Sequence, residues 1–250
     1  QTFSYTITYQ GQTLLTDAKA WLDIKNANYG MISQYRLQSA IKSQVDQTVY
    51  PVVKQKSAQI RDNYQEITFT FDQGLALYFR VYNNGVAYRF STEQSTPFQV
   101  VNERANFNFD KNVQLFFPEE KSFISHNERL YLEKPLADIS AEQFASLPLL
   151  AQDKNVKMVI TETALRDYPG MWLEGTGQQA LSATFPQVVL ASQLKPNSDR
   201  NESISKRASY IADFPMAETA HFPWRIIALA QEDKELLTNQ LSFLLADKNQ

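Results

Sequence analysis

The chain has 250 residues, of which 43% are hydrophobic and 20% charged, a composition that supports a globular fold with a substantial core. Its net charge of −3 argues against a nucleic-acid binder, which needs a basic face for phosphates, and no apolar run is long enough to span a bilayer. It has no cysteine and only two histidines, which excludes disulfides and Cys/His zinc sites, so a hard cation held by oxygens is the metal to expect.

The first part of the chain alternates apolar and polar residues in short runs, which is typical of strands in an antiparallel sheet. These runs are Tyr5–Tyr9, Thr13–Asp17 and Ala20–Ile24. The segment Ile32–Ala40 is compatible with either a strand or a helix. Pro51 within Asp46–Ile60 indicates an edge or irregular strand, because proline lacks the N–H that a strand ladder needs.

The strongest local signal is a β-hairpin centred on Asn83-Asn84-Gly85. A strand at Tyr64–Phe71 precedes it, and apolar residues alternate with polar ones on both sides of the turn. The alternating residues are Leu75, Leu77, Phe79 and Val81 before the turn, and Val86, Tyr88 and Phe90 after it. The Asn-Gly pair supplies the positive φ angles that a tight hairpin turn requires, so we expect this hairpin to form.

The middle of the chain contains further short strand-like runs: Phe98–Val101, Ala105–Phe109, Val113–Phe117 and Asn127–Leu132. We expect Pro118–His126 to be a solvated loop, and we do not assign Glu119 and Glu120 as a catalytic pair, because neighbours in an extended chain point to opposite faces. The spacing of Ser140 and Gln143 predicts a short helical turn.

The last part of the chain again predicts strands, at Leu181–Phe185, Val188–Leu190, Arg207–Ala212, His221–Ala230 and Leu241–Ala246. Lys195–Lys206 is the most polar stretch and is expected to be a mobile surface loop, and Glu232–Leu237 is expected to be a short helical turn. Many short strands without alternating helices predict one large antiparallel sandwich, with no internal repeat or linker.

One acidic residue stands at the end of a strand-like run. Val156, Met158 and Ile160 alternate with more polar residues, and Glu162 follows where the apolar run ends. A carboxylate at a strand end is a place where a metal or ligand can bind, although isolated acids at strand ends are most often surface residues. We expect the nearby Arg166 and Asp167 to form an ion pair that stiffens the following loop.

Several segments resemble, in the same order, the N-terminal domain of glycoside hydrolase family 97. They are YTITYQGQTLL, FRVYNNGVAYRF, VITETALRDYPGMWL, HFPWRIIALA and EDKELLTNQLSFLLA. The combination of ITE-x-x-L-x-DYPG with a later FPWR is the most specific part of the resemblance, which extends over nearly all of the chain.

This resemblance implies an all-β fold, a large antiparallel β-super-sandwich like that of galactose mutarotases, with one or two short helices. Enzymes of the family also contain a catalytic (β/α)8 barrel and a C-terminal β-sandwich, and neither is present in residues 1–250. The resemblance therefore implies a single accessory domain without catalytic residues, whose partner is the catalytic barrel of the same polypeptide. The implied substrates are oligosaccharides that are α-glucosides or α-galactosides.

The resemblance also gives Glu162 a role. In the family, a glutamate of the N-terminal domain joins glutamates of the barrel in holding Ca²⁺ near the substrate, and Glu162 is the matching position in ITE. Because Ca²⁺ takes six to eight oxygens, one carboxylate binds it weakly, and the isolated domain is not expected to hold the ion. The implied location is periplasmic or secreted, although this sequence shows no signal peptide.

Two other functions stay open at this point. A free-standing carbohydrate-binding module would need exposed aromatic rings, for which the candidates are Trp21, Trp172 and Trp224. Tryptophan at alternating strand positions is more often part of a core, which we expect above all for Trp224. An aldose mutarotase-like enzyme would need acid–base groups gathered in one pocket, for which the candidates are His126, Glu128 and His221.

Overall fold

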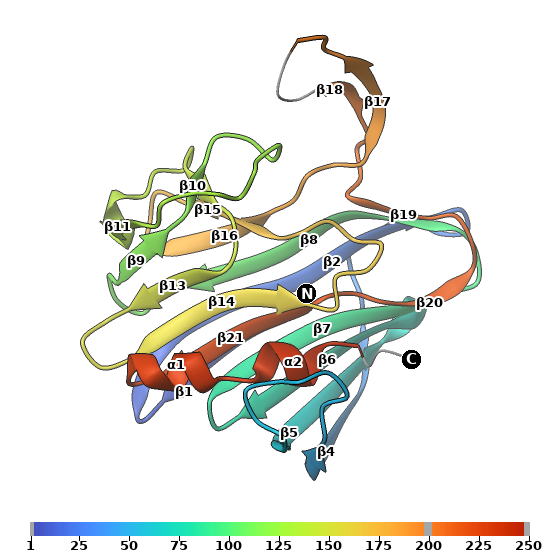
Figure 1. Cartoon of the computed structure of the whole chain (residues 1–250). Helices are drawn as coiled ribbons and strands as arrows, with labels where there is room; N and C mark the ends of the chain where they lie inside the picture. Colours follow the sequence, from blue (N-terminus) through green and yellow to red (C-terminus); the bar gives the residue numbers. More distant parts are fainter. Residues whose placement is uncertain (1–2, 198–201, 248–250) are drawn as a thin grey trace.

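The computed structural model describes residues 3–197 and 202–247. Within these residues, the strands form two large antiparallel sheets packed face to face, and a separate two-stranded hairpin extends from one end (Figure 1). This architecture confirms the all-β antiparallel super-sandwich expected from the strand pattern and from the family resemblance.

The first sheet has nine strands in the described residues. Seven lie in the order β1-β2-β8-β16-β15-β12-β10, while β3 pairs with β2 and β19 pairs with β8. Its strands are β1 (Phe3–Tyr9), β2 (Gln12–Asn26), β3 (Gly30–Ile32), β8 (Phe98–Asn108), β10 (Glu119–Glu120), β12 (Phe144–Ala145), β15 (Trp172–Gly175), β16 (Ala180–Thr184) and β19 (Ala212–Phe214).

The second sheet has ten strands in the described residues, nine of them in the order β11-β9-β13-β14-β21-β7-β6-β5-β4, with β20 added to β7. Its strands are β4 (Leu37–Val49), β5 (Ile60–Phe71), β6 (Leu75–Tyr82), β7 (Gly85–Gln94), β9 (Gln114–Phe117), β11 (Leu132–Pro135), β13 (Leu149–Gln152), β14 (Lys157–Thr163), β20 (Glu218–His221) and β21 (Trp224–Ala230). The separate hairpin pairs β17 (Val189–Leu194) with β18 (Glu202–Arg207).

The main core lies between the two large sheets and is built from the inward residues of alternating strands. Leu22 and Phe107 of the first sheet and Leu77 and Ile227 of the second are almost completely buried in it. Each fully buried side chain of this size stabilises the fold by roughly 1.5–3 kcal/mol relative to exposure. The period-2 pattern read from the sequence therefore corresponds to one face in the core and one face outside it.

The predicted hairpin at Asn83-Asn84-Gly85 is confirmed as the turn between β6 and β7. The chain before Pro51 also behaves as expected, because β4 ends at Val49 and is the edge strand of the second sheet. The ambiguous segment Ile32–Ala40 forms no helix. It contains the last residue of β3, Ile32, a connection, and the start of β4 at Leu37.

The helices are short and lie over the outer face of the second sheet (Figure 1). The expected turn at Glu232–Leu237 is α1 (Asp233–Thr238), which starts at a capping box formed by Glu232 and Glu235. The prediction of a strand at Leu241–Ala246 is wrong, because this segment forms α2 (Leu241–Leu245). Leu241, Leu244 and Leu245 have the i, i+3, i+4 spacing of one helical face, and they pack on Trp224, Ile226 and Ala228 of β21.

Two other local predictions are wrong. Glu120 is not solvated: it lies in the two-residue strand β10, is buried, and accepts a hydrogen bond from Arg129 at 2.7 Å. The turn expected at Ser140 and Gln143 forms but is not helical: the Gln143 N–H donates to the Ser140 carbonyl at 3.2 Å and the Ser140 N–H to Oε1 of Gln143 at 3.0 Å, while the 3-10 turn lies earlier, at Leu136–Asp138. The predicted loop at Lys195–Lys206 contains the start of β18, while residues 198–201 lie outside the described residues.

Gly85 provides a test of the packing between the hairpin turn and the C-terminal segment. Its φ is 158°, and an added Cβ would lie 2.7 Å from the carbonyl oxygen of Ile227 and against Cδ1 of Leu241. We expect Gly85→Ala to lower the free energy of unfolding by about 1–3 kcal/mol more than a glycine replacement in open space, because backbone cannot move aside easily.

The matched control is Gly11→Ala, because Gly11 also has a positive φ, 77°, but has no atom within 4 Å of an added Cβ. Urea denaturation of the two variants measures the difference. Equal losses of stability would show that the turn conformation, rather than contact with Ile227 and Leu241, makes Gly85 necessary.

Candidate functional site

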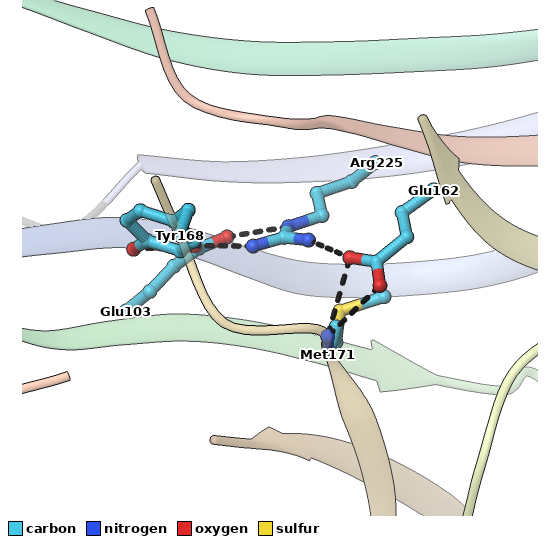
Figure 2. Close-up of polar contacts among 5 residues, drawn as sticks. All are labelled: Glu103, Glu162, Tyr168, Met171 and Arg225. Carbon is cyan, nitrogen blue, oxygen red and sulfur yellow. Dashed lines mark hydrogen bonds and ion pairs between the residues drawn. The ribbon is translucent and has the colours of Figure 1, made fainter. Parts of the chain in front are cut away.

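Glu162 lies near the end of β14, in the part of the strand that pairs with β21. The pairing places Glu162 directly opposite Arg225. Met158 and Ile160 precede Glu162 on the same face of β14 and are buried in the main core. Glu162 therefore points into the space between the two sheets, as Figure 2 shows, rather than out to the solvent.

Arg225 is the centre of a cluster of polar groups between the sheets. Its guanidinium donates from Nε to Oε1 of Glu103 at 2.8 Å and from Nη2 to Oε2 of Glu103 at 2.7 Å, while Nη1 donates to Oε2 of Glu162 (Figure 2). Only 1% of the Arg225 side chain and 2% of the Glu103 side chain are exposed, against 13% for Glu162. Because β8 and β21 belong to different sheets, the bidentate pair joins the two layers of the sandwich.

The loop between β14 and β15 closes the cluster from one side. Tyr168 donates its hydroxyl to Oε2 of Glu103 at 2.8 Å, and the backbone N–H of Met171 lies 3.0 Å from Oε1 and 3.2 Å from Oε2 of Glu162. An added Cβ at Gly170 would lie 3.4 Å from Oε1 of Glu162, at van der Waals contact, so this part of the loop lies directly against the carboxylate.

Burial disfavours the charged forms of Glu162, Tyr168 and Arg225. It raises the pKa of Glu162, although the Arg225 guanidinium and the Met171 N–H act in the opposite direction. It also raises the pKa of Tyr168, an effect that the neighbouring Glu103 carboxylate increases. For Arg225, burial lowers the pKa, but the neighbouring Glu103, Glu162 and Tyr168 together outweigh it and raise the pKa above its ordinary value.

Glu103 reaches the interior because of an irregularity in β8. The pairing of β2 with β8 shifts register between Asp23 and Ile24, so that one extra residue of β8 falls between Val100 and Asn102. Such a bulge changes which residues of a strand face inward. Phe98 and Val100 face the core before it, and Glu103, Ala105 and Phe107 face the core after it.

The interpretation of Glu162 as a solvated strand end is wrong, since the carboxylate is largely buried and bonded to Arg225 and Met171. The ion pair expected between Arg166 and Asp167 is also not formed. Instead, Nε of Arg166 lies 3.0 Å from Oδ2 of Asp247, so it joins the loop to the end of the described chain.

Sequence reasoning singled out Glu162 and named Arg225 only within the FPWR segment, and it missed Glu103. A signal for Arg225 was present, because it is the one charged residue in the run WRIIALA. A charge inside an apolar strand requires a buried partner. No comparable signal marks Glu103, whose inward position depends on the bulge.

The described residues contain no group of three or more His, Asp or Glu side chains that would hold a metal ion by themselves. Glu162 offers oxygens only, which suits a hard cation, and its Oε1 accepts a single backbone hydrogen bond. It therefore fits as one ligand of a site completed by groups from elsewhere. A cleft of about 560 Å³ on the same loop is lined by Asp167, Tyr168 and Pro169, and Glu162 does not line it.

The other candidate residues do not gather into a site. His221 ends β20, while His126 precedes β11, and Figure 1 places these strands at opposite ends of the molecule. Trp21, Trp172 and Trp224 are all buried, as expected for Trp224, and none presents an exposed face for stacking on a sugar ring.

The buried ion pairs predict a large effect of replacing Arg225. We expect Arg225→Met to lower the free energy of unfolding by about 3–5 kcal/mol, because it leaves Glu103 and Glu162 buried without their cation. The control is Arg61→Met, which removes an ion pair with Asp46 of similar length, 2.6 Å, on an exposed surface. Chemical denaturation of both variants measures the difference, and a loss as small in Arg225→Met as in the control would contradict this prediction.

The raised pKa of Glu162 predicts a pH dependence of stability. Above the ordinary value of 4.5, the native state keeps a proton that the unfolded chain has lost, so the free energy of unfolding falls as the pH rises towards the native pKa. We expect Glu162→Gln to remove this fall. Unfolding measured for both proteins across mildly acidic pH tests it, and parallel profiles would show that another group is responsible.

Comparison with known proteins places this chain in a family. The sequence model described as "Glycosyl-hydrolase 97 N-terminal" matches residues 1–247. A relative from Bacteroides thetaiotaomicron, described as a retaining alpha-galactosidase, is 27% identical over 254 residues, a match that covers 97% of this chain and 38% of the relative. The chain thus spans less than two fifths of the curated relative it matches.

Solved structures agree with this at the level of the fold. A glycoside hydrolase family 97 enzyme from Pseudoalteromonas sp. strain K8, in complex with acarbose, matches with a TM-score of 0.73 and 16% identity over 98% of this chain and 35% of its own. A beta-arabinopyranosidase matches with a TM-score of 0.68 and 19% identity over 92% of this chain and 38% of its own. Because the family model covers nearly every residue, the chain belongs to the N-terminal domain family of the family 97 glycoside hydrolases.

Proposed function

We propose that this chain is the accessory N-terminal domain of an α-glycosidase that acts on oligosaccharides that are α-glucosides or α-galactosides. In this proposal it packs on a catalytic barrel of the same polypeptide and supplies one glutamate, Glu162, to a calcium site beside the substrate. Membership of the family supports the first part, as does the fact that the chain spans 38% of a relative described as a retaining alpha-galactosidase.

The observation that carries the proposal for Glu162 is the asymmetry of the buried cluster. Two carboxylates share one guanidinium, and Glu103 takes two of the three N–H donors that Arg225 contributes. Glu162 is the only member with appreciable exposure, so the uncompensated negative charge of the cluster is directed to the rim of the sandwich. A cation supplied with further oxygens from a second domain would neutralise this charge.

The chemistry of the donor fits Ca²⁺, and the part of the chain that the structure describes holds no group of three or more acids or histidines that would complete a site. Carboxylate oxygens are the ligands that Ca²⁺ prefers, and it needs six to eight of them. Glu162 contributes two at most, so the remaining ligands come from the catalytic domain in this proposal. When bound, Ca²⁺ supplies a fixed positive charge and a defined orientation for groups beside the substrate.

Glycoside hydrolysis requires two carboxyl groups placed across the scissile bond. In the described residues, the two acids of the cluster, Glu103 and Glu162, are both bonded to Arg225 and largely enclosed, so they are not arranged to flank a sugar. The catalytic carboxylates are therefore placed on the barrel in this proposal, and the domain alone is inactive.

We also propose that the parent enzyme works in the periplasm or outside the cell, as the family resemblance implies. None of the helices in the described part of the chain has the length and apolarity needed to cross a bilayer.

The proposal predicts how the complete polypeptide responds to metal removal. We expect hydrolysis of p-nitrophenyl α-glucoside or α-galactoside to fall on treatment with a chelator and to return with added Ca²⁺, and Glu162→Gln to weaken this recovery by at least about 10-fold in the Ca²⁺ required. The matched control is Glu66→Gln, which removes a paired carboxylate on the outer face of the same sheet.

Residues 1–250 alone are expected to hydrolyse neither substrate. Turnover by this fragment at the rate of the complete enzyme would refute the accessory role. Recovery by Glu162→Gln at the Ca²⁺ concentration of the unchanged enzyme would refute the role of Glu162.

A further inference from the structure

We propose that Arg225, anchored by Glu103 and Tyr168, is a positioning residue that fixes the carboxylate of Glu162 in the orientation required to bind a cation. This inference rests on the proposed role of Glu162 and extends it to three residues for which no role has been assigned. It is drawn from the hydrogen bonds of the buried cluster and from the way they cross the sandwich (Figure 2).

The first step is the geometry of the guanidinium. Nε and Nη2 of Arg225 are both bonded to Glu103, which fixes the plane of the guanidinium and leaves Nη1 directed to Glu162. A planar fork with two anchored donors has little freedom to rotate, so its third donor has a defined position. The position of the Glu162 carboxylate therefore depends on the bidentate pair.

The second step is the anchoring of Glu103. This carboxylate comes from the opposite sheet and is itself held by the Tyr168 hydroxyl, which bonds Oε2 at 2.8 Å. The ring of Tyr168 is buried and packs against Phe222 and Phe185, with centroids 5.2 and 6.2 Å away. Because this packing is close and rigid, the Tyr168 ring has a fixed place between the sheets, and its hydroxyl holds the Glu103 carboxylate in a fixed position.

The third step is the backbone contact on the other side of Glu162. The Met171 N–H bonds both carboxylate oxygens, at 3.0 and 3.2 Å, so the carboxylate is held between Arg225 and the β14–β15 loop. Tyr168 and Met171 belong to that same loop. One short segment therefore contacts both carboxylates, and it couples the anchor of Arg225 to the orientation of Glu162.

A merely structural role for the ion pairs is the alternative. In that case, weakening the cluster would lower the stability of the domain but leave the affinity of Glu162 for a cation unchanged. A positioning role predicts that weakening the cluster lowers the affinity for the cation. Replacing the hydrogen-bonded groups behind a metal ligand typically changes metal affinity by about 10–100-fold.

Two conservative variants of the complete polypeptide separate these alternatives. Arg225→Lys keeps the positive charge but cannot make the planar fork, and Tyr168→Phe keeps the ring but removes the hydrogen bond to Glu103. The matched controls are Arg80→Lys, which alters a paired arginine on the outer face of the same sheet, and Tyr82→Phe, which removes a buried hydroxyl without a partner.

The measurements are calorimetric titration of the chelator-treated protein with Ca²⁺ alone and the thermal unfolding temperature without metal. We expect Arg225→Lys to bind Ca²⁺ about 10–100-fold more weakly and Tyr168→Phe about 10-fold more weakly, with both controls unchanged. The metal-free unfolding temperature of Tyr168→Phe should be lower than that of Tyr82→Phe, because only Tyr168 loses a hydrogen bond to a buried carboxylate, so the loss of Ca²⁺ affinity is the readout that a merely structural role would not produce. If Arg225→Lys does not fold, Tyr168→Phe decides the question.

The outcomes distinguish this inference from the proposed function. Normal Ca²⁺ affinity in Tyr168→Phe and in folded Arg225→Lys, together with loss of binding in Glu162→Gln, would overturn the positioning role alone. Normal affinity in Glu162→Gln, or no Ca²⁺ binding by the unchanged protein, would overturn both proposals.

Discussion

The ion pairs of Arg225 are the constraint on which the site depends. A guanidinium that is 99% enclosed is stable only if its charge is matched and its donors are bonded, and Glu103 provides most of both. Because Glu103 and Arg225 lie on different sheets, the requirement fixes how the sheets are placed relative to each other at this point. Apolar packing elsewhere in the sandwich has no comparable directionality.

This arrangement gives the domain an uneven distribution of charge in its interior. One cation serves two carboxylates, so a negative charge remains, and the geometry assigns it to the carboxylate nearer the surface. Burial raises the pKa of Glu162, and the neighbouring Glu103 carboxylate adds to this effect, while Arg225 and the Met171 N–H oppose it. In the function proposed above, a catalytic domain that brings a cation would neutralise this charge.

The outer face of the second sheet carries a second, separate set of interactions. Trp224, the neighbour of Arg225 in β21, points the other way and lies between the guanidinium groups of Arg80 and Arg89, each 4.6 Å from its ring centre. The helix α2 packs beside it through Leu241 and Leu245. Alternation along one strand thus places a buried ion-pair cluster on one face and a cation–π stack on the other.

Much of the fold follows from local patterns in the sequence. Alternation of apolar residues predicted the strands, and the hairpin forms where Asn83-Asn84-Gly85 predicted it, although neither asparagine has a positive φ and Gly85, with a φ of 158°, already belongs to β7. The same alternation misassigned Leu241–Ala246, because a short apolar run is compatible with a strand or a helix, and packing on β21 decided for the helix. Composition alone favoured oxygen ligands for any metal, since the chain has no cysteine and only two histidines.

The sequence also singled out Glu162 from its place at the end of an apolar run, and resemblance to a family suggested its role. Only the tertiary structure decided that this carboxylate is buried and shared with Arg225. Glu103, the other carboxylate bonded to Arg225, is 122 residues away from Arg225 along the chain and faces inward only because a bulge changes the register of β8. Strand propensities are local, whereas this cluster depends on pairing between strands and packing between sheets, which no local pattern specifies.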